Sequence, residues 1–124
     1  MPKRILAVEH KQVLATHITR LLVGRGHEIT YCGNDGHKVL EMVSHHPPDL
    51  ILTSLYLKGP MNGIELIDRL WVRWEIPVVV ISGADPSDLP AAWQDRPGFF
   101  FLGKPFLPGQ LCDIIEKALQ QANP

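Results

Sequence analysis

The chain has 124 residues, of which 45% are hydrophobic and 20% charged, and its formal net charge is −1. This length predicts one domain, residues 1–124, that can bury a core without disulfides or metal, either alone or as the front part of a longer protein. Near-neutral charge gives no field that favours nucleic acid or an anionic membrane. No apolar run approaches the ~20 residues of a membrane span, and the two cysteines lack redox or metal spacing. We therefore expect a reduced, cytoplasmic protein.

Apolar patterns alternate between strand-like and helix-like segments along the whole chain. Short apolar or β-prone runs predict five strands, at residues 5–8, 28–31, 50–53, 77–81 and 99–102. Helical spacing of apolar residues predicts four helices, around residues 14–22, 39–43, 64–71 and 111–119. Pro86 and Pro90 limit the segment from 85 to 93 to a short or irregular helix.

The order of these elements predicts an α/β fold. Apolar strands without polar alternation imply a parallel sheet that helices cover on both faces. Right-handed crossovers then give a doubly wound, flavodoxin-like sheet in the order 2-1-3-4-5. Ligands of such sheets bind outside the carboxyl ends of the strands, next to the point where strand order reverses. The polar residues that follow the strands, and that we expect to meet there, are Glu9, His10, Ser54, Ser82 and Lys104.

Several short motifs in the same order resemble the receiver (CheY-like) domain of bacterial response regulators. Glu9 and His10 match the acidic pair after the first strand of that family, and Ser54 matches the phosphoacceptor position. Gly63 matches the glycine after the acceptor loop. The remaining matches are Ser82 at the hydroxyl position, Lys104-Pro105-Phe106 at the family's Lys-Pro-Phe motif, and Phe101 at the aromatic switch position. The resemblance covers nearly the whole chain and implies the five-stranded receiver fold.

The departures from the receiver pattern decide the expected chemistry. The phosphoacceptor is an aspartate in the family, but Ser54 carries an uncharged hydroxyl that can neither form an acyl phosphate nor ligate Mg²⁺ as a carboxylate does. His10 replaces a second acid, which leaves Glu9 as a weak candidate metal ligand. We therefore expect a degenerate pocket with no cofactor, weak or absent Mg²⁺ binding and no enzymatic activity, in which Glu9 can pair with Lys104.

The resemblance implies a role in two-component signalling through protein contacts. The expected partners are a histidine kinase, a phosphotransfer protein or an output domain, and Phe101 and Pro105 are the candidate switch and interface residues. A homodimer through the last helix is a further expectation, with the exposed residues Asp113, Glu116, Lys117 and Gln120.

Two alternatives stay open. The first is a receiver that accepts a phosphoryl group on Glu9, Ser54 or His10. The second is a small enzyme on a flavodoxin-like sheet. It is disfavoured because a serine nucleophile needs an oriented base, and no acid is evident in the sequence to orient His10.

Overall fold

The structure is a computed structural model that describes residues 3–55, 57 and 60–122. Its strands are β1 (Arg4–Val8), β2 (Glu28–Gly33), β3 (Leu50–Ser54), β4 (Val78–Ser82) and β5 (Phe99–Gly103). Its helices are α1 (Gln12–Gly24), α2 (Gly36–His45), α3 (Gly63–Arg73), the 3-10 turn η1 (Pro86–Asp88), α4 (Ala91–Gln94) and α5 (Pro108–Ala122). Among the described residues, no helix combines the length and apolarity needed to cross a bilayer.

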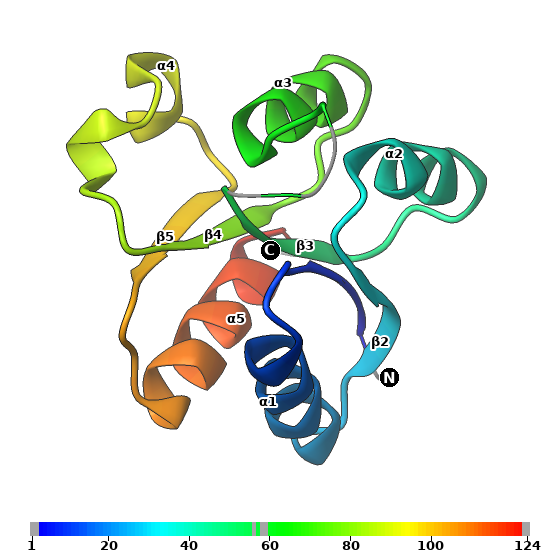
Figure 1. Ribbon diagram of the computed structural model, residues 1–124, viewed down its shortest axis with the longest axis vertical. Helices are drawn as coiled ribbons and strands as arrows, with labels where there is room; N and C mark the ends of the chain where they lie inside the picture. Colours follow the sequence, from blue (N-terminus) through cyan, green and yellow to red (C-terminus); the bar gives the residue numbers. More distant parts are fainter. Residues whose placement is uncertain (1–2, 56, 58–59, 123–124) are drawn as a thin grey trace.

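The strands form one parallel sheet in the order β2-β1-β3-β4-β5, so the predicted fold class is confirmed (Figure 1). Helices α1 and α5 cover one face of the sheet, and α2, α3 and α4 cover the other (Figure 1). Successive residues of a strand point to opposite faces. Accordingly, Val79 and Ile81 pack with α1 and α5, whereas Val78 and Val80 pack in the other layer.

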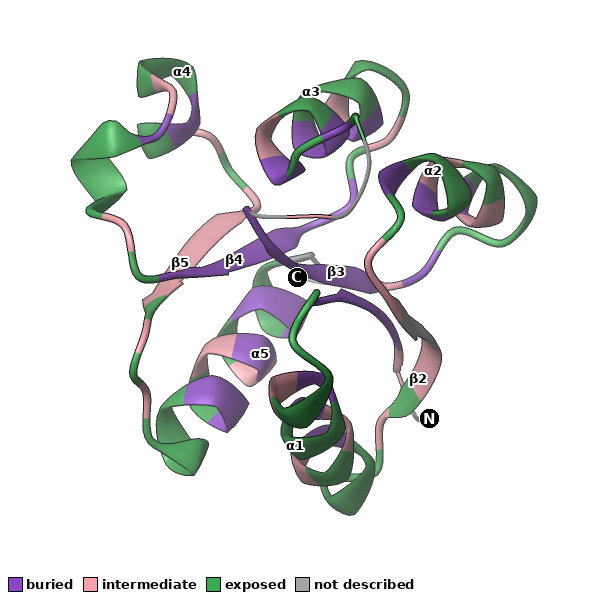
Figure 2. Cartoon of the chain, viewed as in Figure 1, coloured by how far each residue is buried: buried purple, intermediate pink, exposed green. Residues whose placement is uncertain are grey.

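The central strands β1, β3 and β4 are buried almost throughout (Figure 2). The edge strand β5 differs, because α4 has only four residues and cannot cover it fully. Phe99 and Phe101 pack on the α3 side and Phe100 on the α5 side, as the alternation predicts. All three rings are nevertheless only half-buried, so they border the core without being enclosed by it.

Four strands extend past their predicted ends, because backbone pairing continues after the last apolar side chain. Gly33 pairs with Val8, Ser54 with Ile81 and Ser82 with Gly103. Ser54 and Ser82 are therefore the last residues of β3 and β4, not the first residues of the loops that follow. This difference matters because it fixes the two hydroxyl positions on the sheet itself.

The segment between β4 and β5 is short and irregular, as its prolines predict. Asp85 caps η1: its carboxylate accepts hydrogen bonds from the Ser87 backbone N–H and hydroxyl, which hold the pKa of Asp85 below its usual value. Trp93 is buried and its indole Nε1 donates to Asp68 Oδ1 at 3.0 Å. This bond ties α4 to α3, so the Trp93 side chain packs inward and does not contribute to the exposed surface.

Candidate functional site

Strand register brings the predicted polar residues together at the carboxyl-terminal end of the sheet. Val8 is paired with Thr53, Ser54 with Ile81, and Ser82 with Gly103. Glu9 and Lys104 each follow directly after a residue of these pairs. The carboxyl ends of β1, β3, β4 and β5 therefore carry Glu9, Ser54, Ser82 and Lys104 side by side, where the sequence predicted a pocket.

Glu9 is the centre of the polar contacts at this edge. Its side chain is only 3% exposed, and Oε2 lies 3.4 Å from Lys104 Nζ. Oε1 accepts a hydrogen bond from the Lys11 backbone N–H at 3.1 Å and lies 3.2 Å from His10 Nδ1. The Glu9–Lys104 pair expected from the sequence is thus present. The contacts from Lys11 and His10 were not predicted, because they depend on the turn between β1 and α1.

The two serines are buried at the same end of the sheet. Ser54 is 2% exposed and Ser82 is 3% exposed. The Ser82 hydroxyl accepts a hydrogen bond from the Ala84 backbone N–H at 3.0 Å, and the Ser82 carbonyl accepts one from the Lys104 backbone N–H at 2.9 Å. Of the five residues that the sequence places at this edge, only Glu9 carries a carboxylate.

Gly63 holds the loop after β3 against the strand end. Its N–H donates to the Leu55 carbonyl at 2.8 Å. A Cβ on Gly63 would overlap the Ser54 carbonyl oxygen and lie 2.7 Å from the Leu55 Cα. A side chain at this position is therefore incompatible with the backbone packing. Residues 56, 58 and 59 of the same loop lie outside the described residues.

Phe101, Lys104 and Pro105 lie on β5 and directly after it. Phe101 is half-buried and packs against the apolar layer under α3 and α4. The peptide bond between Lys104 and Pro105 is cis, and Pro105 is exposed. Leu107, two residues after Pro105, is 68% exposed, which is high for a large apolar side chain.

No metal-binding cluster is found in the described part of the chain: nowhere in it do three or more His, Cys, Asp or Glu side chains converge as ligands. His10 is exposed and its Nδ1 contacts the Glu9 carboxylate. Cys112 is a buried free cysteine in α5, where it belongs to the core.

These observations define a class: a doubly wound α/β domain with a cluster of polar side chains at the carboxyl ends of its strands. The sequence matches the response regulator receiver domain family over residues 5–116. The chain therefore belongs to the response regulator receiver domain family, a signalling module of two-component systems.

Known relatives cover essentially the whole chain. It is 26% identical over 121 residues to the transcriptional regulatory protein PdtaR of Mycobacterium tuberculosis, which covers 98% of this chain and 58% of PdtaR. It is 31% identical over 122 residues to the DNA-binding response regulator MtrA of Mycobacterium leprae, covering 98% of this chain and 53% of MtrA. The chain thus spans little more than half the length of these curated relatives.

Solved structures agree with the fold. NtrX from Brucella abortus superposes with a TM-score of 0.85 at 27% identity, covering 98% of this chain and 28% of that one. A response regulator receiver protein from Sinorhizobium medicae gives a TM-score of 0.83 at 22% identity and covers 98% of both chains. At 22% identity, the similarity to the Sinorhizobium medicae protein supports the fold alone.

The Glu9–Lys104 pair leads to an asymmetric prediction for stability. Lys104→Met is expected to lower the free energy of unfolding by about 1–3 kcal/mol, because it removes a charged partner from a carboxylate that is 3% exposed. Glu9→Gln should cost less, since the Lys104 side chain is 23% exposed and its ammonium can reach water. Urea denaturation of both variants measures the difference. An equal or larger loss for Glu9→Gln would contradict this description of the pair.

Proposed function

We propose that this chain is a degenerate receiver domain, not phosphorylated at the position of Ser54, that signals through protein–protein contacts. The observation that carries the proposal is the contact set of Glu9. The single carboxylate among the five pocket residues is already bound by the Lys104 ammonium at 3.4 Å and faces His10 at 3.2 Å. The other side chains of the pocket offer hydroxyl groups and cations, which do not replace carboxylates as metal ligands.

The pocket residues do not fit Mg²⁺. This ion requires near-octahedral oxygen ligation and gives up its water reluctantly, so it is bound where carboxylates gather. Here it would have to displace Lys104 from Glu9 and tolerate His10 nearby. Phosphoryl transfer depends on such a metal and on a positioned nucleophile. We therefore expect this pocket neither to bind Mg²⁺ nor to form an acyl phosphate. No enzymatic activity is expected from it.

The surface formed by η1, α4, β5 and α5 is the proposed interface for a signalling partner, such as a kinase, a phosphotransfer protein or an output domain. Phe101 lies beneath it, half-buried on β5. Without a phosphoryl group, this surface either has a single conformation or exchanges between two. In the second case, a partner shifts the equilibrium by binding one conformation more tightly than the other. The Trp93–Asp68 hydrogen bond at 3.0 Å supports the first option, because it fixes α4 to α3.

The homodimer remains part of this proposal, with a narrower set of residues. Asp113, Lys117 and Gln120 are exposed on α5, whereas Glu116 pairs with the His27 ring at 2.9 Å within the same molecule. A two-fold dimer would therefore use the first three residues. A monomeric mass in light scattering at high protein concentration would remove the dimer and leave the rest of the proposal unaffected.

The test of the proposal is phosphorylation itself. The protein is incubated with a small-molecule phosphodonor and Mg²⁺, and its intact mass is measured at low and at neutral pH. We expect no gain in mass, because position 54 has no carboxylate to accept the phosphoryl group. A stoichiometric gain of one phosphoryl group would overturn the proposal and favour the alternative acceptor, with Glu9, Ser54 or His10 then identified by fragmentation.

A further inference from the structure

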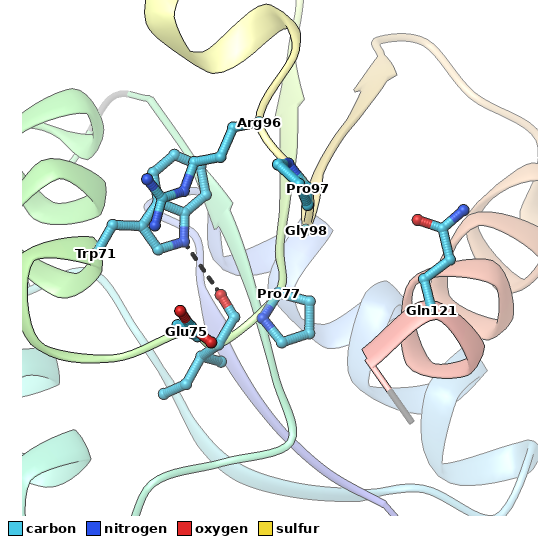
Figure 3. A pocket seen from close by; sticks show the side chains of 8 residues that line it. Trp71, Glu75, Pro77, Arg96, Pro97, Gly98 and Gln121 are labelled. Carbon is cyan, nitrogen blue, oxygen red and sulfur yellow. Dashed lines mark hydrogen bonds between the residues drawn. The ribbon is translucent and has the colours of Figure 1, made fainter. Parts of the chain in front are cut away.

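A second pocket, of about 460 Å³, lies at the end of the sheet opposite to Glu9, where β4 and β5 begin (Figure 3). Trp71 lines it from the last turn of α3, Glu75 from the loop after α3, Arg96 and Gly98 from the turn before β5, and Gln121 from α5. Its volume falls within the range of about 300–1,000 Å³ that is usual for small-molecule sites. None of its residues was predicted to be functional from the sequence, because their proximity depends on the sheet.

Arg96 is held in a fixed position in this pocket. Its guanidinium carbon lies 4.3 Å from the centroid of the Trp71 ring, a cation–π arrangement. Trp71 is itself fixed, since its Nε1 donates to the Ile76 carbonyl at 3.1 Å and its ring packs edge-on against Trp93. The Arg96 backbone N–H donates to the Trp93 carbonyl at 3.0 Å, and the Arg96 carbonyl accepts from the Phe99 N–H at 3.2 Å. The Arg96 guanidinium therefore lies against the Trp71 ring before any ligand arrives.

The hydrogen-bonding capacity of Arg96 is incompletely used. Its Nε is buried and has no hydrogen-bond partner in the described part of the chain. Within that part, the ion pairs closer than 4.0 Å are those of Glu9 with His10 and Lys104 and that of His27 with Glu116, so the Arg96 guanidinium has no carboxylate partner. Because Nε is itself buried, a ligand in the pocket would meet the terminal nitrogens of the guanidinium. The planar fork of a guanidinium matches a planar carboxylate through two parallel hydrogen bonds.

Glu75 adds the opposite charge to the same pocket. Its side chain is exposed and lines the pocket with Arg96 (Figure 3), and it too lacks an ion pair among the residues that the structure describes. A multiply charged anion such as phosphate would bind Arg96 but be repelled by Glu75. A ligand with a carboxylate and an ammonium group would satisfy both charges.

We propose that this pocket binds a small zwitterionic amino acid, with its carboxylate on the Arg96 guanidinium and its ammonium group facing Glu75. The Gln121 side chain amide offers further hydrogen bonds at the α5 wall (Figure 3). The site is separate from the pocket of Glu9 and Ser54, which lies at the other end of the strands, so it would give the domain a small-molecule input that needs no phosphorylation.

The first experiment measures the ligand class. Protein labelled with ¹⁵N is titrated with glycine, β-alanine and their longer straight-chain homologues, and with alkanoates, alkylammonium ions and inorganic phosphate as separate probes. One chain length is expected to give saturable shifts at the Trp71 indole N–H and the Gly98 amide, and to bind about tenfold or more tightly than the matching alkanoate or amine. If phosphate or an alkanoate binds as well as every zwitterion, or if no zwitterion saturates in the millimolar range, the proposal fails.

The second experiment assigns the charges, using matched controls on the exposed face of α3. Arg96→Gln is expected to weaken the best zwitterion about tenfold or more, whereas Arg69→Gln leaves its affinity unchanged. Glu75→Gln should remove the preference over the alkanoate, and Glu65→Gln should not. Thermal melts establish that each variant is folded, and Arg96→Lys, which keeps the charge but loses the planar fork, should bind with intermediate affinity. Unchanged binding by folded Arg96→Gln or by Arg96→Lys would overturn the assignment.

Discussion

A His10→Asp/Ser54→Asp double variant is expected to accept a phosphoryl group from a small phosphodonor in the presence of Mg²⁺, while the unmodified sequence does not. The two substitutions would place three carboxylates at the ends of β1 and β3, next to Lys104 and Ser82. Oxygen ligands of this kind are what Mg²⁺ prefers, and an aspartate at position 54 can form an acyl phosphate. Intact mass measures the gain of one phosphoryl group.

A matched control distinguishes the role of residue 54 as phosphoryl acceptor from the role of residue 10 as metal ligand. His10→Asp/Ser54→Ala should gain no phosphoryl group, because it lacks the acceptor. The double variant should also be less stable than the parent without metal, since the new carboxylate at position 54 would share a buried site with Glu9, and Mg²⁺ should raise its melting temperature. If the double variant is folded and binds Mg²⁺ but gains no phosphoryl group, then residues 10 and 54 are not what prevents phosphorylation of the parent protein.

Gly63→Ala is expected to lower the free energy of unfolding by about 3 kcal/mol or more. A Cβ at this position would overlap the Ser54 carbonyl oxygen and lie 2.7 Å from the Leu55 Cα. Both atoms belong to the backbone, so no side-chain rotation relieves the contact, and the end of β3 or the start of α3 must move. The Gly63 N–H hydrogen bond to Leu55, at 2.8 Å, would be lost or stretched in the process. Urea denaturation measures the change.

Gly109→Ala is the matched control for this variant. Gly109 lies in the first turn of α5, and a Cβ there would meet nothing within 4 Å. Alanine is a better helix former than glycine, so the control should be neutral or more stable by up to about 1 kcal/mol. Similar stability losses for the two variants would show that the contact of Gly63 with the β3 end is not what the sequence requires there.

The fold could be predicted because its information is local. The apolar run from Leu50 to Leu52 has no polar alternation and marks a strand buried on both faces, and the same holds for β1 and β4. With right-handed crossovers, five such strands leave little choice of order. The same logic brought Glu9, Ser54 and Lys104 to one edge, because the carboxyl ends of parallel strands lie together.

What the sequence did not predict depends on contacts between distant segments. The strand ends at Ser54 and Ser82 extend past the apolar runs because pairing with the neighbouring strand continues. The hydrogen bond from Trp93 to Asp68 joins residues 25 positions apart, and Arg96 meets Trp71 across the same gap of 25 residues. Neither amino-acid composition nor local sequence pattern predicts contacts between residues this far apart in the chain. The Lys11 N–H contact to Glu9 is local, but it depends on the exact path of a turn.

The most direct test of the degenerate pocket is an NMR titration of the unmodified protein with beryllofluoride and Mg²⁺, a mimic of the phosphoryl group and its metal. With Glu9 bound by Lys104 and an alcohol at position 54, we expect no saturable shift of the Ser54, Ser82 and Lys104 amides up to millimolar concentrations of both. Tight, stoichiometric shifts of these three amides that depend on both additives would contradict the account.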